Sequence, residues 1–119
     1  METSTTPPST PIGILGGTGK EGKALAARFA AAGFPVTIGS RDSLRAQHTA
    51  HELCLQIEGA VVSGASNPEV ASQGGLVFLC VPYDNAAAAL QSCRDFLPPG
   101  AVVVDRSEER RVGKECRSR

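Results

Sequence analysis

The amino-acid sequence predicts an α/β fold in which helices cover both faces of a doubly wound parallel sheet. Short aliphatic runs alternate with segments of helical periodicity along the 119 residues, and parallel strands need such crossover helices. The run at 76–81 is apolar at every position, as expected for a central strand that is buried on both faces. With right-handed crossovers, the simplest order of the five strands is 3-2-1-4-5.

The first strand and the first helix are expected on either side of a glycine-rich turn. Residues 12–15 form a short aliphatic run, and the segment after the glycines is helical through Ala32. Leu25, Phe29 and Ala32 are expected to share the apolar face of this helix. Gly33 stands where a glycine commonly ends a helix.

The next elements repeat this alternation. Residues 35–39 predict a second strand, and Asp42 is suited to cap the helix that follows it. A third, weaker strand is expected at 60–63. The apolar stripe of the second helix consists of Ala46, Ala50, Leu53 and Ile57.

The second half of the chain completes the sheet. Asn67, Pro68 and Glu69 have the pattern of an N-cap, a proline at the first helical position and a helix-favouring acid, so a short helix is expected there. The elements expected after it are a strand at 76–81, a helix over about 85–96 and a last strand at 101–104.

The glycine-rich turn contains the run Gly17-Thr18-Gly19-Lys20-Glu21-Gly22, a GxGxxG motif between a strand and a helix. In the Rossmann fold, the first glycine permits the tight turn and the second lets the backbone approach a pyrophosphate. The third lets the helix pack close to the sheet, and the helix N-terminus offers free amides to the phosphates. The motif therefore predicts dinucleotide binding; the alternative is a structural turn that binds nothing.

The end of the second strand indicates which dinucleotide is bound. Here Gly39-Ser40-Arg41 replaces the Asp or Glu that an NAD site usually places against the ribose hydroxyls. Ser40 is suited to donate to a 2′-phosphate, and Arg41 to bind it through charge-assisted hydrogen bonds. Arg45 lies in the first turn of the next helix, within reach of the same phosphate. The pattern favours NADP(H); the alternative is a solvated surface pair of arginines, with Arg45 near Asp42.

The end of the central strand is expected to border the nicotinamide ribose. Val81 and Pro82 are predicted to line the cofactor site there, although Pro82 would also stop the strand by removing a hydrogen-bond donor. Tyr83 is a candidate acid, but packing is the alternative. Asp84 is better suited to cap a helix than to catalyse. The sequence predicts no catalytic side chain.

Charge and composition exclude several classes of function. Residues 106–119 hold six of the 12 basic residues and three of the 12 acidic ones, which leaves six basic and nine acidic residues in 1–105. A mildly acidic body of this kind is not a nucleic-acid-binding surface. His48 and His51, with Glu52 beside the latter, are interpreted as an exposed polar face, so no metal site is expected.

The chain is expected to be soluble and cytoplasmic. No apolar run approaches the ~20 residues that a membrane-spanning helix requires. The segment 1–11 lacks the basic start and apolar stretch of a signal peptide and is expected to be a disordered lead-in. Residues 12–105 are predicted to form one NADP-binding Rossmann domain. The four cysteines show no CxxC spacing, so no disulfide framework is expected.

The stretch Ile12-Gly13-Ile14-Leu15-Gly16-Gly17-Thr18-Gly19-Lys20-Glu21-Gly22, together with Ile38-Gly39-Ser40-Arg41, resembles the NADPH-dependent coenzyme F420 reductases. It is similar, more broadly, to the N-terminal domains of pyrroline-5-carboxylate reductases and to the cytosolic domains of STEAP metalloreductases. The resemblance covers residues 12–105.

This resemblance implies roles for individual residues. The pyrophosphate would be held by Thr18, Gly19, Lys20 and Glu21, and the 2′-phosphate by Ser40, Arg41 and Arg45. It also implies direct hydride transfer between the nicotinamide and the deazaflavin ring of coenzyme F420, without a general acid. Small molecules are therefore the expected partners.

The chain departs from the family pattern after Asp105. Family members continue into a further strand and a helical region, which complete the second-substrate pocket and the homodimer of the full-length protein. Here the basic segment 106–119 follows and is predicted not to belong to the fold, because it lacks apolar periodicity. It resembles a read-through peptide appended to a truncated reading frame; a genuine tail that binds an anionic partner is the alternative.

Two other functions remain open at the level of the sequence. One is an enzyme on the same half-fold that reduces an imine, ferric ion or small carbonyl compound. The other is a non-catalytic module that senses NADP(H) and signals through its tail. If the chain is truncated, it is expected to bind NADP(H) without turnover.

Overall fold

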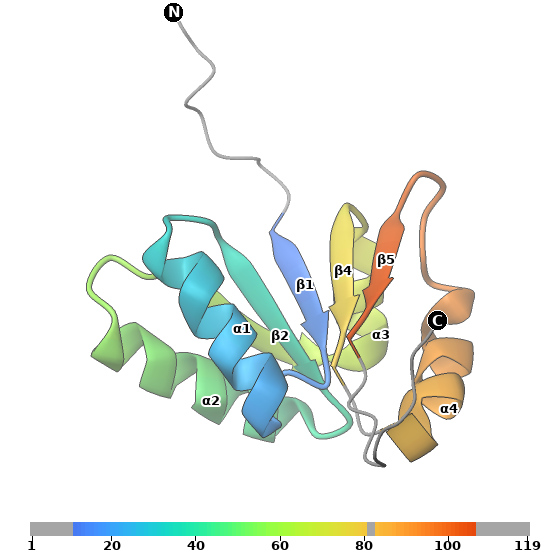
Figure 1. Ribbon diagram of the computed structural model, residues 1–119, viewed down its shortest axis with the longest axis horizontal. Helices are drawn as coiled ribbons and strands as arrows, with labels where there is room; N and C mark the ends of the chain where they lie inside the picture. Colours follow the sequence, from blue (N-terminus) through green and yellow to red (C-terminus); the bar gives the residue numbers. More distant parts are fainter. Residues whose placement is uncertain (1–10, 81–82, 107–119) are drawn as a thin grey trace, which may run out of the picture.

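The computed structural model describes residues 11–80 and 83–106, with side chains from residue 87 onward in the second range (Figure 1). The strands all run parallel in the order β3-β2-β1-β4-β5, which confirms the predicted doubly wound sheet. The elements along the chain are β1 (Ile12–Leu15), α1 (Lys20–Ala31), β2 (Val36–Ser40), α2 (Ser43–Gln56), β3 (Val62–Ser66), α3 (Asn67–Gln73), β4 (Leu76–Leu79), α4 (Tyr83–Arg94) and β5 (Val102–Asp105).

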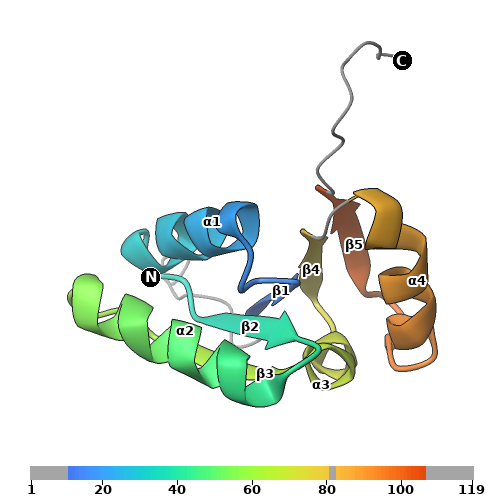
Figure 2. The ribbon, with the colours of Figure 1, turned by 90° about the horizontal axis from the view of Figure 1, so that it is seen from below.

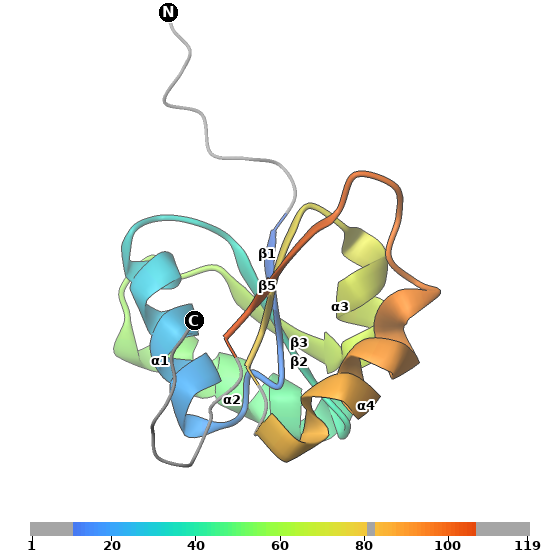
Figure 3. The same cartoon turned by 45° about the vertical axis from the view of Figure 1, so that its right-hand side comes forward.

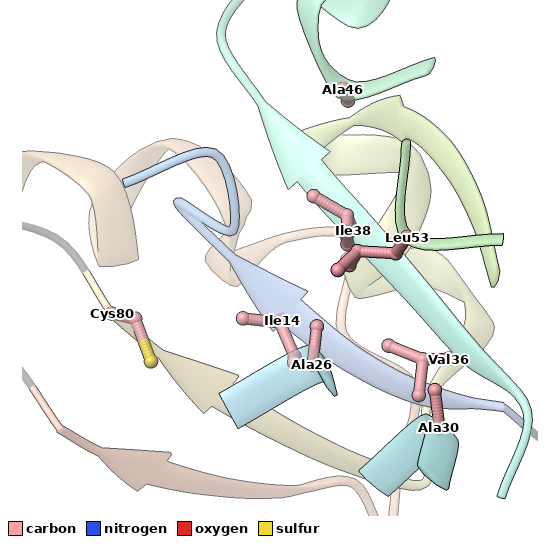
Figure 4. Packing of buried hydrophobic residues seen from close by; sticks show 8 residues of the cluster. All are labelled: Ile14, Ala26, Ala30, Val36, Ile38, Ala46, Leu53 and Cys80. Carbon is pink, nitrogen blue, oxygen red and sulfur yellow. The ribbon is translucent and has the colours of Figure 1, made fainter. Parts of the chain in front are cut away.

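The helices lie in two layers, with α1 and α2 on one face of the sheet and α3 and α4 on the other (Figure 3). The first core joins α1 and α2 to the sheet, and Figure 4 shows its buried members: Ile14, Ala26, Ala30, Val36, Ile38, Ala46, Leu53 and Cys80. The second core lies under α3 and α4 and comprises Leu15, Val70, Ala71, Val77, Leu79 and Cys93. Burial of these side chains is the main stabilising term of the fold.

The face of helix α1 that contacts the sheet matches the expected one only in part, since Leu25 and Phe29 pack against the first core but are not its most buried residues. Its buried residues are the small ones, Gly22, Ala26 and Ala30, whereas Leu25 and Phe29 lie at the flanks and Ala32 is exposed. Small residues let the helix axis approach the strands closely, and the larger side chains then pack beside the contact. Hydrophobic periodicity does not take side-chain size into account, so it did not predict that the smallest residues lie nearest the strands.

The segment from 60 to 69 also differs from the prediction. Strand β3 begins at Val62 rather than residue 60 and extends through Ser66. The N-cap of α3 is Ser66, which forms a capping box with Glu69, so Asn67 is the first helical residue instead of the cap. Gly64 lies within this strand, and α2 packs so closely there that a Cβ would lie 2.3 Å from the carbonyl carbon of Ala46.

The last elements agree with the prediction apart from their ends. Strand β4 ends at Leu79 rather than 81, and α4 spans 83–94 instead of 85–96. After β5, the Arg106 amide donates to the Leu79 carbonyl at 2.8 Å, so the first residue of the basic segment 106–119 is hydrogen-bonded to β4. Among the helices in the described parts of the chain, none has the length and apolar character needed to cross a membrane.

Candidate functional site: the carboxyl edge of the sheet

The glycine-rich turn between β1 and α1 lies at the carboxyl edge of the sheet, beside the ends of β2 and β4 (Figure 1, Figure 2). The Gly17 amide donates to the Gly39 carbonyl at 2.9 Å, which ties the turn to the end of β2. The Gly19 amide donates to the Gly16 carbonyl at 3.3 Å and closes the turn. Gly16 itself has φ +73°, a conformation that favours glycine.

Two glycines of the motif are required by the protein itself. A Cβ at Gly17 would lie 2.5 Å from Cγ2 of Ile38, and one at Gly22 would lie 2.7 Å from both the Gly16 oxygen and the Gly17 Cα. Gly22 therefore lets the first turn of α1 rest directly on the backbone of the loop. These two positions would have to be glycine even if the turn bound nothing.

Gly19 has no such requirement. A Cβ there would meet only the Gly16 oxygen, at an ordinary 3.6 Å, and its φ of −77° and ψ of 172° suit any residue. The residue is exposed at the start of α1. Because neither packing nor backbone geometry calls for glycine, the missing side chain leaves room for something outside the protein.

The N-terminus of α1 also differs from those of two neighbouring helices. Asp42 caps α2 by accepting from the Leu44 amide at 3.0 Å, and Ser66 caps α3. At α1 the cap is Gly19, and no side chain of the described residues accepts from the first amides of the helix. Uncapped amides together with the helix dipole form a site suited to an anion.

The other side chains of the motif surround this helix end. Lys20 is exposed and Thr18 half-buried. The carboxylate of Glu21 accepts from the Arg106 guanidinium at 3.0 Å in a partly exposed ion pair. A pair at this level of exposure contributes little to stability.

At the end of β2, Ser40 is buried and its hydroxyl oxygen accepts from the Asp42 amide at 3.2 Å. The hydroxyl hydrogen is left for another acceptor. Arg41 and Arg45 are both exposed, and neither forms an ion pair within the described residues. The expected proximity of Arg45 to Asp42 does not produce a salt bridge. Two unneutralised guanidiniums thus accompany one oriented hydroxyl group.

Sequence reasoning assigned Asn67 to a helix cap and missed its contact with the glycine loop. Its Oδ1 accepts from the Gly16 amide at 3.3 Å, across 51 positions of the sequence, and the residue is 6% exposed. Nδ2 has no acceptor within the described residues. The sequence signal was a polar residue directly after a strand at the carboxyl edge of the sheet.

Beneath this edge, Cys80 follows β4 and its amide donates to the Leu15 carbonyl at 2.9 Å. Burial, with a further contribution from the Glu21 carboxylate, raises the pKa of its thiol to about 11. Cys80 is therefore a protonated, inert side chain at neutral pH. Val81 and Pro82, predicted to line the site, lie outside the described residues.

Elsewhere on this chain, His48 and Glu52 form an exposed i, i+4 pair on α2 at 3.4 Å. Within residues 11–80 and 83–106, no three His, Cys, Asp or Glu side chains come together in a way that would hold a metal ion. The chemistry that the described site supports is the binding of anionic groups at two adjoining places, the start of α1 and the end of β2.

Comparison with known proteins agrees with this geometry. Residues 11–108 match the model of a family described as "NADP oxidoreductase coenzyme F420-dependent". An F420-dependent NADP reductase of Methanothermobacter thermautotrophicus is 44% identical over 87 residues, which cover 71% of this chain and 37% of the relative. A reductase of the same name from Methanothermobacter marburgensis is 39% identical over 97 residues, covering 79% and 42%.

A third F420-dependent NADP reductase, from Methanocaldococcus jannaschii, is 35% identical over 98 residues, covering 78% of this chain and 43% of the relative. The chain thus spans about two fifths of the length of these curated relatives. Among solved structures, a reductive aminase from Aspergillus terreus in complex with NADPH and ethyl-5-oxohexanoate has a TM-score of 0.59. The aminase is 24% identical in sequence and shares the fold. The match covers 84% of this chain and 32% of the aminase chain.

Proposed function

This chain belongs to the family of coenzyme F420-dependent NADP oxidoreductases, and on that premise we propose that it is the NADP(H)-binding domain of an enzyme that transfers hydride between NADPH and the deazaflavin coenzyme F420. Membership rests on the family match over residues 11–108. Because the chain spans about two fifths of its curated relatives, the reaction, the second substrate and the assembly of the whole protein belong to the proposal.

The pyrophosphate is proposed to bind at the start of α1, against Gly17-Thr18-Gly19-Lys20-Glu21-Gly22. The single observation that carries this assignment is Gly19, which is free of a side chain although neither packing nor backbone conformation requires it. The uncapped amides of α1 start at the same residue. A diphosphate would accept their hydrogen bonds and meet the positive end of the helix dipole.

The 2′-phosphate is proposed to bind at the end of β2. The Ser40 hydroxyl oxygen accepts from the Asp42 amide, and its hydrogen has no acceptor among the described residues, so it is available to donate. The exposed guanidiniums of Arg41 and Arg45 lie close by in the sequence and are not neutralised by described residues. The two positive charges would stabilise the 2′-phosphate of bound NADPH. NADH lacks this phosphate and would gain nothing from them.

The nicotinamide is proposed to lie past the end of β4, where Val81 and Pro82 would line its site. NADPH, when bound, supplies a hydride, and the deazaflavin ring accepts it directly. No side chain needs to move a proton in such a transfer, so the protein contributes chiefly by holding the two rings in register. The full-length protein is proposed to be a cytoplasmic homodimer that acts on small molecules and not on nucleic acid.

The proposed cofactor preference is tested by titrating the chain with NADPH and with NADH and following nicotinamide fluorescence. We expect tighter binding of NADPH. Arg41→Ala is expected to weaken NADPH binding roughly tenfold or more, because a charge-assisted hydrogen bond is lost, and to leave NADH binding nearly unchanged.

Arg28→Ala provides the matched control, since Arg28 is an exposed arginine in the last turn of α1, at the far end of the helix from the proposed site. It should leave both affinities unchanged. Equal affinities of the wild-type chain for NADPH and NADH would remove the assignment of Ser40, Arg41 and Arg45.

A further inference from the structure

Asn67 connects the ends of three strands at the carboxyl edge of the sheet. It follows β3 directly, yet its side chain passes β2 and reaches the loop after β1. Strand order explains the span, because β2 lies between β3 and β1. Gly16 is the first residue of the glycine-rich turn, and its amide donates to Oδ1 of Asn67 at 3.3 Å.

The end of β2 is shaped to let this side chain through. A Cβ at Gly39 would lie 2.6 Å from Oδ1 of Asn67 and 3.3 Å from its Cα. Gly39 has no positive φ, so its backbone conformation does not explain the glycine. The absence of a side chain at Gly39 therefore makes room for Asn67, which is only 6% exposed.

Asn67 is hydrogen-bonded to the residue whose backbone conformation forms the turn. Gly16 has φ +73°, and its carbonyl accepts from the Gly19 amide. The same carbonyl lies against Gly22, where α1 rests on the loop. Asn67 therefore holds the peptide group that leads into Gly16, and the next peptide group carries the carbonyl that closes the turn and contacts α1.

We propose that Asn67 is a positioning residue that holds the phosphate-binding loop in its binding conformation before the dinucleotide arrives. The inference rests on the proposed function, because it gives that loop a pyrophosphate to bind. A loop already fixed by an internal hydrogen bond loses less conformational entropy on binding than a free one. Asn67 acts through Gly16 and is not assigned a contact with the substrate.

The test compares Asn67→Leu, which keeps the branched shape of the side chain but loses the acceptor, with Glu69→Ala. The control variant removes the capping box from the same helix without touching the loop. We expect Asn67→Leu to weaken NADPH and NADH binding by the same factor, about tenfold, because both carry the pyrophosphate. Glu69→Ala should leave both affinities unchanged, measured on the folded fraction.

The equal loss separates this inference from the cofactor preference. Arg41→Ala is expected to affect NADPH alone, whereas Asn67→Leu affects both dinucleotides. If wild type binds NADPH and Asn67→Leu binds it equally well, the positioning role is wrong and the proposed function stands. If wild type binds neither dinucleotide, the proposed function fails first.

A second measurement starts from the wild-type chain and covers the case in which Asn67→Leu does not fold. Amide hydrogen exchange by NMR on the wild-type chain without cofactor should show the Gly16 amide protected, and NADPH should add little to that protection. Asn67→Asp, which keeps the acceptor, should preserve it. Exchange of the Gly16 amide at the rate of an open loop in the folded, cofactor-free chain would overturn the proposal.

Discussion

Individual glycines of the motif have different physical reasons for being there. Gly17 and Gly22 are fixed by contacts inside the protein, with Ile38 and with the loop backbone respectively. Gly19 has room for a side chain. The sequence predicted a purpose for each glycine from the motif alone. Asn67 escaped prediction, because its contact depends on the strand order and on the missing Cβ of Gly39.

Gly22→Ala is expected to destabilise the chain by about 1–3 kcal/mol or more, since the new methyl group meets backbone atoms at 2.7 Å and forces α1 away from the loop. Urea unfolding of the variant beside wild type measures this. Gly33→Ala is not a suitable reference because of its φ of +97°. A variant as stable as wild type would show that α1 does not rest on the loop as described.

The raised pKa of Cys80 makes the free energy of unfolding decrease at alkaline pH. Its pKa is raised to about 11 in the folded chain, above the ~8.5 of an unfolded thiol, so the thiolate is favoured on unfolding. The stabilising effect of Cys80 is full below pH ~8.5 and declines as the pH rises towards 11. We expect the stability advantage of wild type over Cys80→Ala to be smaller at pH 9.5 than at pH 7.5. An advantage that stays constant in urea unfolding would contradict the raised pKa.

At the scale of elements, hydrophobic periodicity predicted the order of strands and helices correctly. It predicted the residues at which they begin and end less accurately. Periodicity placed five strands and four helices correctly in sequence. It misplaced β3, because Gly64 and its small neighbours look like a loop in the sequence and become a strand only where α2 covers them. The sequence around Gly64 does not indicate that a helix from another part of the chain packs against it.

Asp42 caps α2 and lies beside the proposed 2′-phosphate site, where its amide donates to the Ser40 hydroxyl oxygen. Asn serves as an N-cap as well as Asp does, so Asp42→Asn should keep stability within about 0.5 kcal/mol, whereas Asp42→Ala should lose about 1 kcal/mol. Removing the carboxylate charge beside Arg41 is expected to strengthen NADPH binding relative to NADH, and the effect should shrink at high salt. Weaker NADPH binding by Asp42→Asn would argue against a phosphate at this position.

At the scale of the whole molecule, the two faces of the sheet are covered unequally. Val77 and Val103 pack under α3 and α4, while Leu76 and Val102, paired across β4 and β5, are 37% and 55% exposed. The sequence predicted the fold and its strand order, but not this difference. Which apolar residues lose contact with water depends on how far α1 and α2 extend across the sheet.

Val102→Thr is therefore expected to change stability by less than about 0.5 kcal/mol, since the side chain is already half in water. Val77→Thr, on the opposite face and fully buried, should cost well over 1 kcal/mol because its hydroxyl group would be buried in an apolar core. Thermal unfolding of the two variants compares them directly. Equal losses would mean that the β5 edge is covered in solution.

The central claim is that the turn after β1 binds a dinucleotide, and Gly19→Ala tests it most directly. Gly19 has φ −77° and ordinary space for a Cβ, so urea unfolding should show a stability within about 1 kcal/mol of wild type. Titration of the same variant with NADPH should show binding weakened more than tenfold, because the methyl group occupies the place where the pyrophosphate approaches. A stable Gly19→Ala chain that binds NADPH as tightly as wild type would contradict the account.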